Sequence, residues 1–207
     1  LLFPLKLISG SGWPSDTRLI VCWLRQMVSV LPMILAAGIF VWLGTRFKKR
    51  FLSVGLFLFL LPIPAVLLNH FWWHPDSLAV LLVALILFFL DRDALRFGKS
   101  FYAAAACCGV ALSVKYTGVY FAPVIPLYLL LGRFRGEVRL RVILFRGALF
   151  VGVMFLFLVL SNPLLLLPQE RAEIIRTQQL QFEQTGTGIF VRYQTPFFEN
   201  GNLPADV

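Results

Sequence analysis

A short polar and aromatic segment, residues 70–78, separates two apolar runs and carries His70, His74 and Asp76. Titratable side chains at the end of a membrane-spanning run cost free energy and usually mark a functional site. The side chains of Asp76, His70 and His74 could supply a base or orient a substrate hydroxyl. Asp76 also precedes an apolar run, so a simple helix N-cap is the alternative interpretation.

The same segment has plainer explanations that stay open. Trp72 and Trp73 fit an interfacial aromatic belt. The two histidines, four residues apart, would share one face of a helix and could ligate a metal together with the aspartate. Pro75 argues against a regular helix there. We therefore predict no definite metal site, and a divalent metal stays an open alternative.

Two cations are placed where they could meet an anion. Arg25 lies within a long apolar run, and Lys115 lies at a break between two short ones. Cationic side chains bind phosphate well, so phosphate is the anion that we expect. The alternatives are an Arg25 that pairs with a carboxylate or a helix-end carbonyl, and a Lys115 that snorkels to the membrane interface.

The composition predicts an integral membrane protein. Of the 207 residues, 59% are hydrophobic and the mean hydropathy is +0.82, whereas soluble domains are about 45–50% apolar. The net charge of +9 does not indicate a nucleic-acid partner, because most basic residues lie in short linkers between apolar runs, as orientation signals do.

The apolar runs predict an all-α, polytopic transmembrane bundle of about five to six membrane segments. Residues 1–17 are expected to end an external loop, 18–167 to form the transmembrane domain, and 168–207 to form an external loop with a membrane-surface helix at 170–184. The first predicted segments are 18–44 with a kink at Pro32, 51–69 bent or broken near Pro62 and Pro64, and 77–90 continuing into 91–96. They are followed by two short and closely packed helices within 101–131 and by 143–167, which ends at residues 161–163 or just after.

The linkers between these segments predict the orientation of the chain. Four, three and four Lys or Arg residues lie in linkers 45–50, 91–100 and 133–142. The alternate connections, 70–76 and 115–118, contain only Lys115. The positive-inside rule places the basic linkers in the cytoplasm. Asp76, Lys115 and the polar C-terminal stretch should then share the opposite face.

Four local motifs occur in an order that resembles a known family. They are Arg18-Leu-Ile-Val-Cys-Trp-Leu-Arg25, His74-Pro-Asp-Ser-Leu78, Gly109-Val-Ala-Leu-Ser-Val-Lys-Tyr-Thr-Gly118 and Ser161-Asn-Pro163. The pattern is similar to the GT-C class of integral-membrane glycosyltransferases, in particular the dolichyl-phosphate-mannose protein mannosyltransferases and the aminoarabinose transferases. The resemblance covers roughly residues 18–190.

The resemblance implies inverting transfer of a sugar from a polyprenyl-phosphate donor to a protein, lipid or glycan acceptor. Transfer would occur at the non-cytoplasmic face of a prokaryotic plasma membrane, or of the endoplasmic reticulum in a eukaryote. Such enzymes use an acidic residue of the first external loop as base. Residues 1–17 contain only Asp16, so we expect the principal base upstream of Leu1.

The same resemblance assigns roles to individual residues. It implies that Arg25, Lys115 and the adjoining Tyr116 bind the lipid phosphate, and that Asp76 and His74 belong to the catalytic side. The chain departs from the family near residues 185–188, Thr-Gly-Thr-Gly, which lack the histidines often found there.

Two other functional classes stay open on the sequence. Short, broken helices also occur in secondary transporters and lipid flippases, although no internal repeat is visible in this chain. A non-catalytic membrane subunit is the third hypothesis. It predicts that changes at Lys115 and Asp76 leave the activity of an assembled complex intact.

Overall fold

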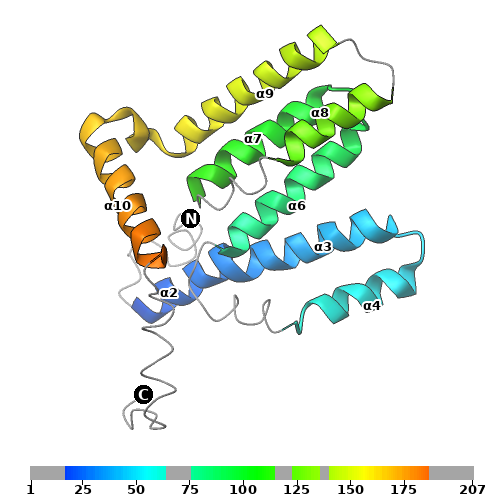
Figure 1. Cartoon of the computed structure of the whole chain (residues 1–207). Coiled ribbons are helices and arrows are strands. Elements are labelled where there is room, and N and C mark those ends of the chain that lie inside the picture. Colours follow the sequence, from blue (N-terminus) through cyan, green and yellow to red (C-terminus); the bar gives the residue numbers. More distant parts are fainter. Residues whose placement is uncertain (1–16, 64–75, 115–122, 136–139, 187–207) are drawn as a thin grey trace, which may run out of the picture. The chain divides into compact units, whose positions relative to one another are not determined.

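The computed structural model describes residues 17–63, 76–114, 123–135 and 140–186, and throughout these ranges the regular structure is helical (Figure 1). The all-α prediction is therefore confirmed for the described chain. Two compact units are present, Leu1–Ser161 and Asn162–Val207. In the first unit the helices are α2 (Thr17–Arg25), the π-helix η1 (Gln26–Val30), α3 (Leu31–Thr45), α4 (Arg50–Leu60), α6 (Asp76–Asp93), α7 (Lys99–Val114), α8 (Val124–Phe134) and α9 (Leu140–Ser161).

The first predicted span is a continuous helix that contains a short π-helical segment. The π-helix η1 joins α2 to α3, and the N–H of Leu31 donates to the carbonyl of Gln26. Pro32 follows at the start of α3. Proline has no N–H to donate and its ring crowds the preceding turn, and π-bulges commonly absorb such a break. The expected irregularity at Pro32 thus takes the form of a π-helix.

Within the described ranges, two helices are long and apolar enough to cross a membrane, Leu19–Thr45 with 27 residues and Leu140–Ser161 with 22. Shorter apolar helices are α4, α7 and α8. Large apolar side chains are widely exposed, and the exposed fraction reaches 96% at Phe51 and 70% at Phe59 on α4. Exposed apolar surface of this extent is typical of a face that meets lipid or another protein.

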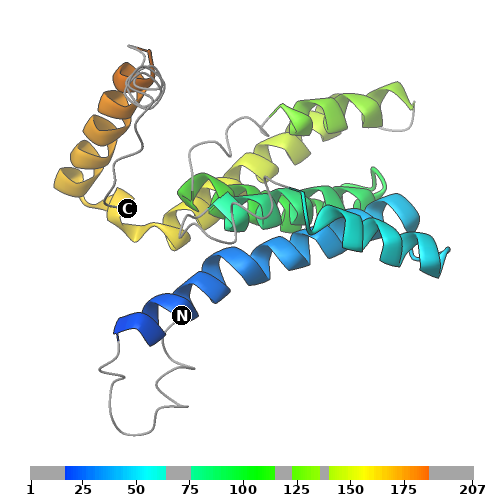
Figure 2. The ribbon, with the colours of Figure 1, turned by 90° about the horizontal axis from the view of Figure 1, so that it is seen from below.

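Helices of the first unit run alternately toward and away from one common end. The α3 and α6 helices are parallel, because the Trp42 and Phe88 rings lie 4.9 Å apart and Arg46 pairs with Asp91 at the ends of the two helices. In Figure 1 the order is α4, α3, α6, α7 and α9, and Figure 2 shows the same neighbours from below. The turns after α3, α6 and α8 therefore lie at the same end of the unit.

The small residues of α7 allow close packing, as predicted, but the partner differs from the predicted one. A Cβ on Gly109 would lie 2.2 Å from the Met154 carbonyl oxygen and 2.9 Å from the Leu158 nitrogen, both in the α9 backbone. The close neighbours of α7 are α6 and α9. The α8 helix reaches α7 mainly through aromatic side chains, including Tyr128, which stacks on Phe101 at 5.9 Å. The two short helices predicted within 101–131 are present as α7 and α8, but the prediction that they pack closely on each other is wrong, because α9 covers the small face of α7.

Most helix ends lie close to the predicted positions. The α4 helix ends at Leu60, before the prolines of the second run, and α6 continues through the apolar run to Asp93. The last long helix of the first unit, α9, ends at Ser161. In the second unit, the 3₁₀ helix η3 (Pro163–Leu166) is followed by α10 (Pro168–Gly186), so the predicted helix at 170–184 is present. Residues 1–16 and 64–75 lie outside the described chain.

Candidate functional site

The residues proposed from sequence divide into two groups. His70, His74, Lys115 and Tyr116 lie outside the described residues. Arg25 is the last residue of α2, and Asp76 is the first residue of α6. The site geometry that the structure describes is therefore that of these two residues and their neighbours.

Arg25 and Ser77 carry buried polar atoms without a hydrogen-bond partner. The Arg25 Nε and the Ser77 Oγ are both buried and unpaired within the described chain. The Ser77 side chain is fully buried. A buried donor without a partner costs about 1–3 kcal/mol, so native structures retain such atoms chiefly where a water, ion or ligand completes them. An arginine in this position is suited to an anion.

Asp76 is half-buried in the first turn of α6. A carboxylate there is stabilised by the positive end of the helix macrodipole, and this position also suits a helix N-cap. That role leaves the carboxylate at the same end of the unit as Arg25, because α6 contacts η1, the segment directly after Arg25. The two interpretations of Asp76 are therefore geometrically compatible.

The segment around η1, the start of α6 and the end of α7 lie at the end of the first unit that is away from the basic turns. The α6 helix begins at Asp76 beside η1, and α7 runs antiparallel to α6 after the turn at 94–98, so it ends at Val114 near the start of α6. Lys115 follows Val114 directly in the sequence. The first unit thus gathers Arg25, Asp76 and Ser77 at the end from which the 115–118 motif continues.

The described residues do not contain a cluster of metal-ligating side chains. Within the ranges that the structure describes, no group of three or more His, Cys, Asp or Glu side chains could hold a metal ion. The histidines that the sequence offers as ligands are outside those ranges.

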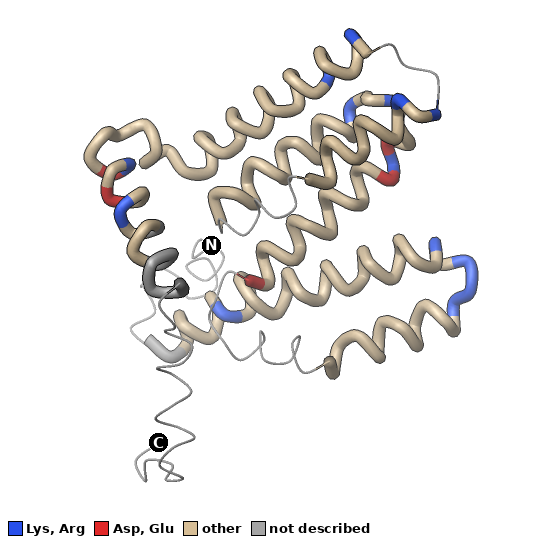
Figure 3. The backbone as a smooth tube through the Cα atoms, viewed as in Figure 1, with Lys and Arg blue, Asp and Glu red and all other residues tan. Residues whose placement is uncertain are grey.

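Basic side chains concentrate at the opposite end, around the turns after α3, α6 and α8 (Figure 3). Arg46 lies 4.3 Å above the centre of the Trp42 ring and forms an ion pair with Asp91. Its side-chain hydrogen bond with Asp91 raises the pKa of Arg46 above its ordinary value. The ion pair fixes the end of α3 against the end of α6.

Asp93 organises this end of the unit, although its sequence context predicts no more than a polar helix end. Its side chain is 4% exposed. The carboxylate accepts hydrogen bonds from the N–H groups of Phe97 and Gly98, each at 2.8 Å, and from the Tyr128 hydroxyl at 2.9 Å. The Tyr128 hydroxyl in turn accepts from the Leu95 N–H at 2.7 Å. A carboxylate with three donors is a stable buried arrangement.

This network holds a strained turn. Ala94, Leu95 and Phe97 have φ values of 50°, 62° and 54°, a region that residues other than glycine seldom occupy. No glycine occurs at these three positions to signal the turn, so local sequence patterns could not reveal it.

A cavity of about 580 Å³ lies beside this turn. Arginines from three elements line it: Arg96 of the 94–98 turn, Arg135 after α8, and Arg146 of α9. Arg146 is half-buried and donates to the Tyr102 hydroxyl at 3.0 Å. Among the described residues none of these three guanidinium groups pairs with a carboxylate. Within the described chain the cavity therefore combines space with three guanidinium groups that no described carboxylate pairs.

Comparison of the chain with protein-family models, with curated proteins and with solved structures found no match. The likeness to the GT-C glycosyltransferases rests on the order of the four sequence motifs. The first of these motifs, residues 18–25, lies entirely within the helix α2.

Proposed function

We propose that this protein is a membrane glycosyltransferase that moves a sugar from a polyprenyl-phosphate donor to a protein, lipid or glycan acceptor at the non-cytoplasmic membrane face. The chain would be multi-pass, with its basic turns in the cytoplasm. The proposal follows from the sequence motifs and from the charge pattern of the linkers.

One observation carries the proposal furthest. The buried Arg25 Nε has no hydrogen-bond partner in the described chain, and it lies at the end of the unit opposite the basic turns. A lipid phosphate would satisfy this donor. It is also the leaving group of the reaction, so fixed positive charge beside it would stabilise the transition state.

Other features also indicate that the substrate site lies at the Arg25 end of the first unit. The Ser77 Oγ, which has no partner among the described residues, can donate to a phosphate or a sugar, and the helix-starting Asp76 carboxylate can accept from a sugar hydroxyl. The widely exposed apolar faces of α4 and α9 suit a membrane location. In this proposal Lys115 and Tyr116 complete the phosphate side, and His74 assists Asp76.

The experiment that tests the proposal separates a transferase from a flippase. Proteoliposomes that contain the full-length protein are supplied with radiolabelled polyprenyl-phosphate sugar and with membrane extract as acceptor source. A transferase moves label from the lipid fraction into an acceptor fraction. A flippase leaves the label on the lipid and changes only the leaflet that a soluble sugar-cleaving reagent can reach, and that result would contradict the proposal.

A further inference from the structure

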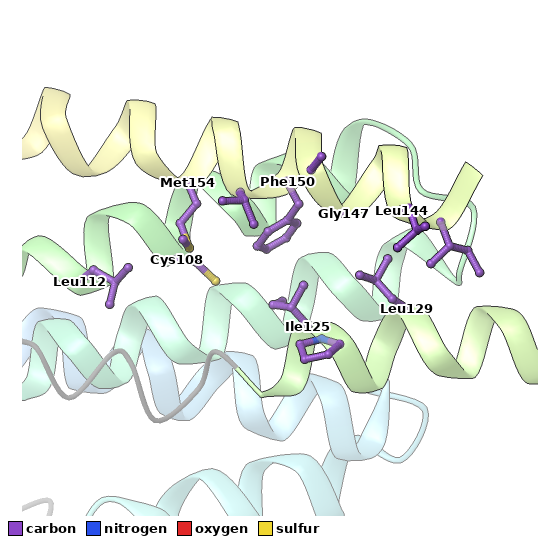
Figure 4. Close-up of a pocket in the computed structure, with 12 residues that line it drawn as sticks. Cys108, Leu112, Ile125, Leu129, Leu144, Gly147, Phe150 and Met154 are labelled. Atoms are coloured by element: carbon purple, nitrogen blue, oxygen red, sulfur yellow. The ribbon is translucent and has the colours of Figure 1, made fainter. Parts of the chain in front are cut away.

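A second cavity, of about 500 Å³, lies next to the arginine-lined cavity and is almost purely apolar in its lining. Figure 4 shows Met154, Phe150 and Leu144 of α9 directed toward the space that Ile125 and Leu129 of α8 also face. The two cavities use neighbouring positions on the same two helices. On α9, Arg146 belongs to the first cavity and Gly147 to the second.

Along α8 the two cavities follow one another, whereas on α9 their lining residues interleave between Val142 and Gly147. Arg135, directly after the end of α8, lines the charged cavity, whereas Leu129 and Ile125 line the apolar one farther from the basic end. From Leu144 to Met154 the apolar cavity follows α9 for roughly 15 Å at 1.5 Å per residue. This length is about half of a 30 Å hydrocarbon core, the depth of one leaflet.

The guanidinium groups that line the first cavity favour an anion, because none of them pairs with a carboxylate among the described residues. Arg146 lies in α9, whose sequence is strongly apolar apart from Arg141 and Arg146, and its described partner is the neutral Tyr102 hydroxyl. A guanidinium near the membrane core is costly unless it is compensated. Guanidinium groups from three elements around one cavity match the several oxygens of a phosphate.

We propose that the basic end of the first unit binds an anionic phospholipid. Its phosphate would lie against Arg96, Arg135 and Arg146, and one of its acyl chains would occupy the apolar cavity between α8 and α9. Basic pockets between membrane helices on the cytoplasmic side recognise anionic headgroups by this combination of charge and depth. The inference depends on the membrane location in the proposed function, but not on sugar transfer.

Close packing and hydrogen bonds hold the segments that carry Arg96 and Arg135 in fixed positions. A Cβ on Gly132 would lie 2.6 Å from the Phe97 ring, so only glycine lets the end of α8 approach the 94–98 turn this closely. The hydrogen bonds of Asp93 fix that turn. Arg96 and Arg135 are consequently carried by segments in direct contact.

The test measures which lipids the purified full-length protein retains. The protein is reconstituted in nanodiscs of equal parts phosphatidylcholine and phosphatidylglycerol, extracted with mild detergent and analysed by native mass spectrometry. We expect bound phosphatidylglycerol to exceed phosphatidylcholine. The triple variant Arg96→Gln, Arg135→Gln, Arg146→Gln should lower this preference about tenfold or more.

A matched control removes the same charge from the same region. Arg92, Arg133 and Arg141 are exposed and do not line the cavity. Their combined change to Gln should leave the lipid preference near that of the wild type. If the first triple variant does not fold, the double variant Arg96→Gln, Arg135→Gln, which keeps the Arg146 hydrogen bond, replaces it. Equal losses in the pocket and control variants would overturn the proposal in favour of diffuse charge attraction.

Two further experiments test whether an acyl chain occupies the apolar cavity. Ala148 is exposed and lines the apolar cavity, so Ala148→Phe should fill it and reduce retained phosphatidylglycerol severalfold. Free glycerol phosphate carries the anion without a chain and should not displace the bound lipid. Unchanged retention in Ala148→Phe, or displacement by glycerol phosphate, would overturn the two-part site.

Discussion

The Tyr128 hydroxyl donates a hydrogen bond across 2.9 Å to the buried carboxylate of Asp93, and so joins α8 to the end of α6. The same hydroxyl accepts from the Leu95 N–H. One phenol therefore links two helices and the strained turn between α6 and α7.

This link predicts a clear effect on stability. Tyr128→Phe removes the hydroxyl, leaves the Leu95 N–H without its acceptor and takes one donor from a buried carboxylate. The free energy of unfolding should fall by about 1–3 kcal/mol. Unfolding by denaturant in mild detergent, followed by circular dichroism, measures it. Asp91→Asn, which breaks an exposed ion pair, is the control and should have a smaller effect. Equal losses in the two variants would contradict the role of the Tyr128 hydroxyl in this network.

Close packing between α7 and α9 predicts that alanine destabilises the protein at Gly109 but not at Gly152. Gly109→Ala places a methyl group against α9 backbone atoms, and overpacking of this kind costs about 1–3 kcal/mol or more. Gly152→Ala meets nothing within 4 Å, so it should be neutral or slightly stabilising because alanine favours helix. Thermal unfolding in detergent compares the two. A well-tolerated Gly109→Ala would show that the helices are farther apart.

Orientation can be measured by cysteine accessibility. In a background without native cysteines, Lys48→Cys and Arg133→Cys at the basic turns should resist a membrane-impermeant maleimide in intact cells. Asn162→Cys, just after α9, should react, because the positive-inside rule places the basic turns in the cytoplasm. Labelling of both sets, or the reverse pattern, would refute the multi-pass orientation.

The substitution Asp76→Asn distinguishes a helix-capping role of Asp76 from a role in substrate binding or catalysis. Asn caps helices about as well as Asp, so Asp76→Asn should leave expression and thermal stability nearly unchanged. If Asp76 contacts the substrate, the rate of sugar transfer should fall at least about tenfold. Normal transfer by a well-folded Asp76→Asn protein would leave capping as its only role.

Sequence patterns predicted what depends on hydrophobicity, proline and charge. The helix ends near Leu60 and Ser161 follow from prolines nearby, and the shared end of the three basic turns follows from alternating charge. Arg25 was identified from sequence because an arginine within an apolar run is costly. Its unpaired Nε is visible only in three dimensions.

The parts that sequence did not predict depend on tertiary contacts. Asp93 adjoins Arg92 in a stretch that resembles a solvated helix end, and only the turn and Tyr128 make it buried. The small residues of α7 predicted a close neighbour but could not indicate that α9, rather than the next helix in sequence, would fill that place.

The most direct test of the central claim is the transfer rate of the full-length protein with Arg25 changed. Membranes with wild type, Arg25→Ala or the exposed control Arg92→Ala receive radiolabelled polyprenyl-phosphate sugar, and label entering the acceptor is followed over time. A phosphate-binding Arg25 predicts that Arg25→Ala lowers the rate about a hundredfold, as loss of a charge-stabilising donor does elsewhere, whereas Arg92→Ala transfers normally. A stably expressed Arg25→Ala protein with the wild-type rate would contradict it.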